Sequence, residues 1–224
     1  AGEIELIRRA VDTNSKALAR TLGKIKAGMK ERDLAAELEY QMRRAGAERP
    51  SFETIVASGA RAALPHAKPS GEPVLANQLL LIDMGATQDG YTSDMTRTVF
   101  VGSAPVKWKK NYRAVLEAQL AAVAAIRAGV RTSKVDGAAR GVLKKHGLDK
   151  AFTHSTGHGL GLEIHENPRV GKKDKTVLKA GMVITVEPGV YLEGEGGIRI
   201  EDTVLVTATG CEVLTPTSKE LTVL

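Results

Sequence analysis

Four carboxylates and one histidine stand in apolar, glycine-punctuated segments of this sequence, where a charged side chain should be costly. An ionised carboxylate in such a setting has to be paired or bound to a cation. Four of them near one another would repel strongly unless divalent cations neutralised them. The sequence therefore predicts an enzyme built on metal ions. The five candidate ligands are Asp83, Asp94, His158, Glu187 and Glu201.

The first two acids follow segments that would otherwise be buried strands. Asp83 comes directly after the apolar run LLLI, which predicts a buried strand and not a solvated loop. Aspartate is a poor strand former, so its presence there needs another reason. Asp94 lies beyond the turn Asp89–Gly90, so the two acids could face each other on adjacent strands. A salt bridge from either aspartate to Arg97 is the ordinary alternative.

The other two acids stand in similar settings nearer the C-terminus. Glu187 ends the apolar run VITV, and Glu201 lies in the segment GIRIED. Strand alternation puts Arg199 and Glu201 on one face and the isoleucines on the other. A surface ladder is the ordinary alternative here, but four such acids in two similar pairs favour a shared site.

Three of the five histidines, His154, His158 and His165, fall within one glycine-rich segment, HSTGHGLGLEIHE. Glycines let the backbone approach a site closely, and histidine offers both a metal-binding nitrogen and a group for proton transfer. A fourth histidine, His66, stands in the loop LPHAKP, where two prolines restrict the backbone. Isolated histidines are usually structural, but this clustering favours a functional site.

Helices alternate with groups of strands along the chain, which indicates an α+β fold. Apolar residues recur at helical spacing in two segments of each half, and apolar runs bounded by glycine turns mark the strands. The expected helices cover residues 3–26, 31–45, 106–127 and 132–145, and the expected strands cover residues 54–58, 79–101, 182–192, 197–207 and 211–215.

The two halves of the chain also resemble each other. The segment IKAGMK at 25–30 matches IRAGVR at 126–131, and each half then supplies one histidine and two carboxylates. A few identities can arise by chance between amphipathic helices, but the parallel order of functional groups favours a duplication. We expect one domain over residues 1–224, with halves of about 1–104 and 105–224 related by a pseudo-twofold axis where the carboxylates meet.

Composition narrows the remaining classes of protein. The formal net charge of +6 is mild, and the densest basic run, KWKKNYR at 107–113, is better explained as the start of an amphipathic helix than as a nucleic-acid surface. The single cysteine, Cys211, excludes an internal disulfide and suits a reducing compartment. No apolar stretch approaches the roughly 20 residues that span a bilayer, and no signal-peptide pattern is present. We expect a soluble, cytoplasmic protein with no membrane or nucleic-acid partner.

At these motifs the sequence resembles the metal-dependent peptidases with the pita-bread fold. Within that group it resembles the branch of X-Pro aminopeptidases (aminopeptidase P) and X-Pro dipeptidases (prolidases). The histidine pattern favours this branch over the methionine aminopeptidases. The motifs are PHAKP at 65–69, LLLIDMGA at 79–86, YTSDMTRT at 91–98, HSTGHGLGLEIHE at 154–166, TVEPGVY at 185–191 and GIRIED at 197–202.

The resemblance implies a two-metal site. Asp83 would chelate one ion, Asp94 and Glu201 would bridge both ions, and His158 and Glu187 would complete the other. Two such ions acidify a shared water and polarise a carbonyl group. Four carboxylates and one imidazole suit Mn²⁺ best, with Co²⁺ and Zn²⁺ as alternatives.

The resemblance also implies catalytic and substrate-binding roles. Glu187 would move a proton towards the departing nitrogen, while His66 and His165 would donate hydrogen bonds to the substrate and the oxyanion. A proline after the scissile bond has no N–H and a fixed ring, so it needs a dedicated pocket. His154 and Arg199 would shape that pocket.

The expected activity is hydrolysis of the X-Pro bond at the N-terminus of peptides or in X-Pro dipeptides. A methionine aminopeptidase, and a pita-bread module that only binds protein or nucleic acid, are the alternatives. Relatives of this branch usually carry an N-terminal domain that helps enclose the site and mediates oligomerisation. This sequence begins almost at once with the first catalytic-domain helix, so we expect the catalytic domain only and leave a homodimer open.

Overall fold

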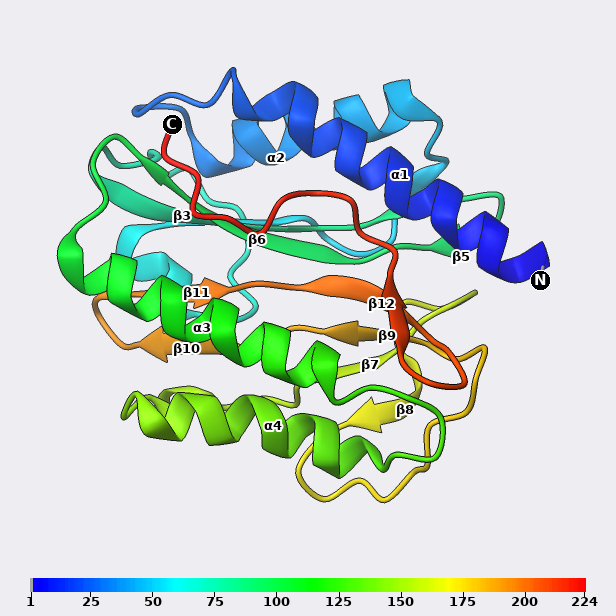
Figure 1. Cartoon of the computed structure of the whole chain (residues 1–224). Helices are drawn as coiled ribbons and strands as arrows, with labels where there is room; N and C mark the ends of the chain where they lie inside the picture. Colours follow the sequence, from blue (N-terminus) through cyan, green and yellow to red (C-terminus); the bar gives the residue numbers. More distant parts are fainter. Residues whose placement is uncertain (1) are drawn as a thin grey trace.

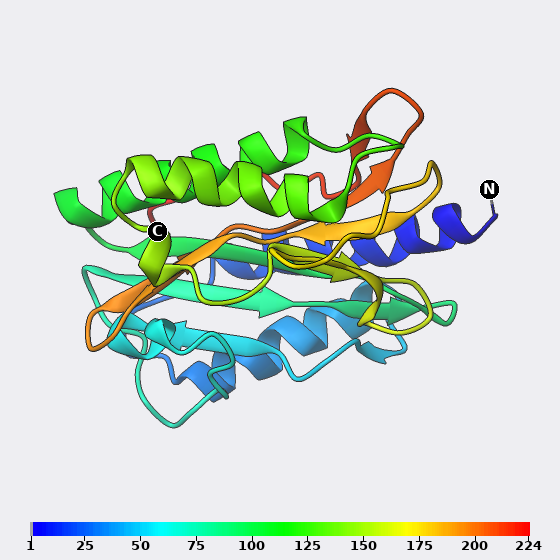
Figure 2. The same ribbon diagram turned by 90° about the horizontal axis from the view of Figure 1, so that it is seen from below.

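The computed structural model describes residues 2–224. Two pairs of helices flank the strands, α1 (Gly2–Leu22) with α2 (Glu31–Ala45) and α3 (Val106–Ala124) with α4 (Thr132–Lys145) (Figure 1). A view turned by 90° again shows strands of both halves between the helix pairs (Figure 2). The expected α+β class and the four helices are confirmed. No helix within the described residues has the length and apolar character to cross a bilayer.

The strands form two larger sheets and two smaller ones, all with antiparallel pairing between neighbours. One larger sheet has the order β2 (Ile55–Ser58), β3 (Gln78–Met84), β6 (Met95–Val101), and the other has the order β13 (Cys211–Val213), β12 (Asp202–Val206), β9 (Val183–Val186), β7 (Gly157–Gly159), β8 (Glu166–Val170). The smaller ones are β1 (Arg49–Pro50), β4 (Ala86–Gln88), β5 (Tyr91–Thr92) and the hairpin β10 (Gly189–Leu192), β11 (Gly196–Arg199). Short 3₁₀ helices cover Gly59–Ala63 and Asp149–Ala151.

Apolar faces explain how each helix pair is held to its sheet. On α2, Leu34, Leu38 and Met42 recur at helical spacing, are fully buried, and belong to the same core as Leu80 and Ile82 of β3. Burying each such side chain contributes about 1.5–3 kcal/mol. The helix pairs therefore fix the sheets whose ends carry the candidate ligands.

The turns that lead into α2 and α4 have the same geometry. Gly28 (φ 91°) donates its N–H to the carbonyl of Val74 at 2.9 Å, and Gly129 (φ 86°) donates its N–H to the carbonyl of Leu178 at 2.8 Å. Glycine adopts such positive φ values without strain. The motif repeated in the sequence thus builds the same local structure in both halves.

The long segment expected as strand over residues 79–101 is divided into four strands. A Cβ at Gly85 would lie 2.2 Å from the carbonyl oxygen of Ser93, so only glycine lets the two backbones approach there. Asp89 and Gly90 both have positive φ, 50° and 78°, and close the turn between β4 and β5. The sequence interpretation missed β7 and β8, because glycines and Pro168 hide their alternation.

The ends of two helices also differ from expectation. The segment 3–26 was expected to be helical throughout, but α1 ends at Leu22. There the N–H groups of Lys24 and Ile25 bond to the carbonyls three residues earlier, at 2.8 and 3.2 Å. Bonds of this 3₁₀ type replace the α-helical bonds to the fourth residue back and end the helix. Likewise α3 stops at Ala124 instead of 127.

Candidate metal centre

A cleft of about 960 Å³ contains every residue that the sequence singled out as a ligand, catalytic group or substrate contact. Its walls come from both halves, since Asp83 of β3 and Asp94 before β6 belong to the first half, and His158 of β7, Glu187 after β9 and Arg199 of β11 belong to the second. Segments far apart in the sequence thus converge on one site. The residues are His66, Asp83, Asp94, His154, His158, His165, Glu187, Arg199 and Glu201.

Asp83 and Asp94 lie diagonally across the β3–β6 pair. The register places Asp83 opposite Thr96, and Asp94 comes two residues before Thr96, just ahead of β6. Residues two apart on a strand share a face, and diagonal neighbours remain within reach of each other. Both carboxylates therefore point to the same side of the sheet.

Three candidate ligands, one from each of three segments, already lie close enough to hold one cation. Asp94, His158 and Glu201 each offer a ligand atom, and these atoms lie within 4.8 Å of one another. His158 Nε2 is 3.5 Å from Asp94 Oδ2 and 3.5 Å from Glu187 Oε1. Two atoms that bind one cation at about 2.0–2.2 Å lie at most about 4.4 Å apart, so a small side-chain adjustment would let these three atoms share a divalent cation.

Burial makes this group of acids unfavourable without a cation. Asp94 is 6% exposed and Glu201 is 1% exposed. Burial raises the pKa of the Asp94, Glu187 and Glu201 carboxyl groups, and repulsion from neighbouring carboxylates raises the pKa of Asp94 and Glu201 further. Divalent cations would remove this penalty.

Two buried carboxylate oxygens have no hydrogen-bond partner, Oδ1 of Asp83 and Oε1 of Glu201. Nearly all buried polar atoms in proteins are satisfied, so such orphan acceptors need a reason. A cation is the natural partner for an unpaired carboxylate oxygen. The donor set is therefore the one a divalent metal ion requires.

Arg199 is buried beside these acids, and its guanidinium donates to three side chains and to the Pro65 carbonyl. Its Nη2 donates to Asp83 Oδ2 at 2.5 Å, its Nε donates to Thr96 Oγ1 at 3.0 Å, and its Nη1 donates to the Tyr191 hydroxyl at 2.7 Å. The pairing with Asp83 was not foreseen, and Tyr191 was not singled out although it lies in the motif TVEPGVY. Side-chain pairing over such sequence separations leaves no local signal.

Both ordinary alternatives to a metal site are wrong. Arg97 bonds to the Asp202 carboxylate at 2.8 Å and to neither Asp83 nor Asp94. Arg199 and Glu201 do not form a surface ladder, because both side chains are buried. Within the described residues, pairing with an arginine or lysine therefore accounts for Asp83 alone, through Arg199, and leaves the other three acids unexplained.

His154 is held neutral by its surroundings. Its Nδ1 lies 2.8 Å from the Ser155 carbonyl oxygen, which can only accept, so Nδ1 carries the proton and Nε2 accepts from the Tyr191 hydroxyl at 2.8 Å. Burial, and then the positive charge of Arg199, lowers the pKa of His154 to about 4. The ring is thus a fixed, uncharged wall of the cleft.

This predicts a measurable acid sensitivity. Because the pKa of His154 falls from 6.5 to about 4 on folding, the unfolded chain binds more protons below pH 6.5, and stability is lost as the pH falls from 6.5 towards 4. The full loss is about 3 kcal/mol. In urea unfolding of chelated protein at pH 7, 5 and 4, His154→Gln should lose less stability than the wild type by that amount. His146→Gln, at the exposed end of α4, is the control and should follow the wild type; parallel curves for His154→Gln and wild type would contradict the assignment.

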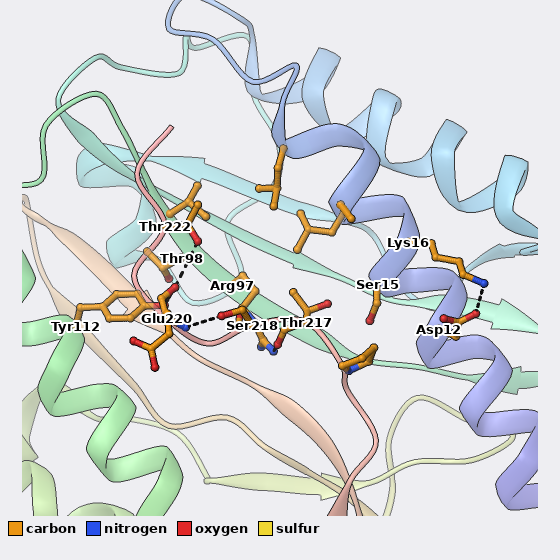
Figure 3. Close-up of a pocket in the computed structure, with 15 residues that line it drawn as sticks. Asp12, Ser15, Lys16, Arg97, Thr98, Tyr112, Thr217, Ser218, Glu220 and Thr222 are labelled. Atoms are coloured by element: carbon orange, nitrogen blue, oxygen red, sulfur yellow. Dashed lines mark hydrogen bonds and ion pairs between the residues drawn. The ribbon is translucent and has the colours of Figure 1, made fainter.

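A second cavity, of about 380 Å³, lies between α1, β6 and the C-terminal segment (Figure 3). Its lining contains no histidine, and its acids are Asp12, which pairs with Lys16 at the surface, and Glu220. None of the candidate ligands borders it. This cavity therefore offers no ligand set like that of the larger cleft.

Comparison with known proteins agrees with this geometry. Residues 5–208 match the model of metallopeptidase family M24. A Xaa-Pro dipeptidase of Pyrococcus furiosus is 48% identical over 219 residues, which cover 98% of this chain and 63% of that protein. Solved structures of a Xaa-Pro dipeptidase from Bacillus anthracis and an X-Pro aminopeptidase from Thermotoga maritima are each 44% identical to this chain, with TM-scores of 0.98. Each match covers 100% of this chain and 63% of the other chain.

These matches confirm the expected pita-bread fold, with its helix pairs and antiparallel sheets. The chain spans about 63% of the length of these relatives. The family model covers the segments that carry all five candidate ligands. The chain belongs to metallopeptidase family M24.

Proposed function

We propose that this chain is the catalytic part of an exopeptidase that cleaves the bond before proline in X-Pro dipeptides or at the N-terminus of X-Pro peptides. The observation that carries the proposal is the convergence of four carboxylates and one imidazole, two of whose buried oxygens lack any partner. Relatives named Xaa-Pro dipeptidase and X-Pro aminopeptidase support the substrate class.

Two divalent cations, Mn²⁺ first, would be held by this shell. Asp94 and Glu201 would contact both ions, Asp83 one of them, and His158 and Glu187 the other. When bound, such a pair supplies an acidified water and polarises the scissile carbonyl. Oxygen-rich donors suit Mn²⁺ better than they suit zinc, which prefers nitrogen and sulfur.

The remaining side chains would move protons and orient the substrate. Burial raises the pKa of Glu187, which suits a carboxylate that takes a proton and passes it to the departing nitrogen. His165 packs edge-on against His158, with ring centroids 4.5 Å apart, and burial lowers its pKa. A neutral His165 keeps one N–H to donate to the carbonyl oxygen, and His66, which also lines the cleft, would donate a second hydrogen bond.

Proline recognition would fall to His154 and Arg199 in the wall of the cleft, which are joined through the Tyr191 hydroxyl. Because proline offers no N–H, it cannot be held by strand pairing and must be recognised by shape and by its carbonyl or carboxylate. The hydrogen bonds among these three groups fix their orientation before substrate arrives. Such preorganisation lowers the cost of binding.

A substrate panel tests the proposal. After chelation and reconstitution with Mn²⁺, Co²⁺ or Zn²⁺, the protein should hydrolyse X-Pro dipeptides or tripeptides at least about 100-fold faster than matched X-Ala peptides, because a site built around the proline ring favours it by more than about 2.7 kcal/mol. Preference for N-terminal Met peptides would instead identify a methionine aminopeptidase. Hydrolysis of no peptide with any of the metals would overturn the proposal.

The non-catalytic alternative has lost its main support. It rested on the basic run at 107–113, in which aromatic residues alternate with cations. In the structure Trp108 and Tyr112 face inward from α3 and are buried in the core. They are unavailable for stacking on nucleic-acid bases.

A further inference from the structure

Thr96 occupies a central place in the site although it is not a candidate ligand. It lies in β6, opposite Asp83, and is completely buried. Its hydroxyl oxygen is 2.6 Å from Glu201 Oε2 and 3.0 Å from Arg199 Nε. One hydroxyl therefore connects a candidate ligand to the buried arginine.

The direction of both hydrogen bonds is fixed by chemistry. The Nε–H of Arg199 can only donate, so the Thr96 hydroxyl oxygen accepts from it. The single hydroxyl proton of Thr96 must then go to Glu201 Oε2. A hydrogen bond to a guanidinium strengthens the outgoing bond of the same hydroxyl.

The consequence is that one oxygen of Glu201 is occupied and the other is free. Oε2 accepts from Thr96, and Oε1 is the buried atom without a partner. Asp83 has the same arrangement, since its Oδ2 accepts from Arg199 Nη2 and its Oδ1 has no partner. Arg199 thus occupies one carboxylate oxygen on each of two acids. It donates a hydrogen bond directly to Asp83, and it acts on Glu201 through the hydroxyl of Thr96.

We propose that Thr96 is a positioning residue of the metal centre, which turns the Glu201 carboxylate so that Oε1 faces the cations. This inference rests on the proposed two-metal function. Outer-shell hydrogen bonds of this kind typically change metal affinity by about 10- to 100-fold when they are removed. Without the hydroxyl, Glu201 gains rotational freedom and Arg199 Nε loses its acceptor.

The test replaces the hydroxyl by a methyl group of similar volume. Thr96→Val should weaken Mn²⁺ binding by about 10- to 100-fold, measured by titration calorimetry and by the electron paramagnetic resonance signal of free Mn²⁺. Thr96→Ser keeps the hydroxyl and should bind Mn²⁺ within about 3-fold of the wild type.

Thr98 offers a matched control on the same strand. It is 1% exposed, donates to the Arg199 carbonyl at 3.0 Å and accepts from the Arg199 backbone N–H at 3.2 Å, so like Thr96 it donates one hydrogen bond and accepts one, but neither of them involves a candidate ligand. Thr98→Val should therefore lose stability in urea as Thr96→Val does, while keeping wild-type Mn²⁺ affinity.

The outcomes separate the positioning role of Thr96 from the proposed two-metal function. Wild-type Mn²⁺ affinity in Thr96→Val, or an equal loss in Thr98→Val, overturns the positioning role and leaves the proposed function intact. If Thr96→Val does not fold, a loss of 10-fold or more in Thr96→Ser overturns the role, because the hydroxyl is still present. Absence of Mn²⁺ binding in the wild type itself overturns both.

Discussion

Asp94→Asn should lower kcat for X-Pro hydrolysis by at least about 10³-fold while leaving the chain folded. The amide has almost the shape of the carboxylate but no charge and only one oxygen, so it cannot bind two cations as the carboxylate would. It also removes one of several buried acids that repel each other, and the free energy of unfolding of the chelated protein should stay the same or rise. Activity and Mn²⁺ binding should thus fall in a variant whose urea midpoint does not.

The control for this prediction lies in the same part of the chain. Asp89 is exposed at the turn between β4 and β5, where its φ of 50° is one that asparagine adopts readily. Its ion pair with Arg9, at 3.4 Å on the surface, contributes at most about 1 kcal/mol. Asp89→Asn should therefore keep both activity and Mn²⁺ binding. Full activity of Asp94→Asn after reconstitution with metal would contradict the two-metal mechanism.

The contrast between these two aspartates shows why much of the site could be predicted from the sequence. Asp89 stands beside a glycine in a polar turn, where a charge costs nothing, while Asp83 and Asp94 border strands that must be buried. Placing acids next to apolar runs is unfavourable, so their position is itself a signal of function. Periodicity likewise predicts α2 and α4 at their observed ends, because each has a sharp apolar stripe, with Gly46 directly after α2 and Gly147 two residues after the end of α4.

The sequence could not show which arginine pairs with which acid. Arg97 and Arg199 both lie near candidate ligands in sequence, and nothing local distinguishes them. The register of β6 and the path of the chain between β11 and β12 decide the matter, and they give Asp202 to Arg97 and Asp83 to Arg199. Because these choices depend on contacts between distant segments, they follow from tertiary structure and not from local pattern.

Arg97→Met should cost about 3–5 kcal/mol of stability, the largest loss expected from any of these substitutions. The guanidinium is buried, and each of its five N–H groups has an acceptor. Thr217 and Ser218 of the C-terminal segment lie beside Arg97 (Figure 3). Methionine fills similar space but leaves these acceptors without a donor. The acceptors are the carbonyl oxygens of Thr96, Glu201, Thr217 and Ser218 and the Asp202 carboxylate.

Urea unfolding of chelated protein measures this loss, with Arg9→Met as the control because Arg9 forms only an exposed pair and should cost at most about 1 kcal/mol. Asp202 keeps Lys219 at 2.7 Å and Gln119 at 2.9 Å, so its charge stays compensated and the variant can still fold. A loss below 1 kcal/mol in Arg97→Met would show that the buried bonds are replaced by water. Arg97 also donates to the backbone carbonyl of Glu201, which helps to position this candidate ligand, so the surviving protein should bind Mn²⁺ more weakly.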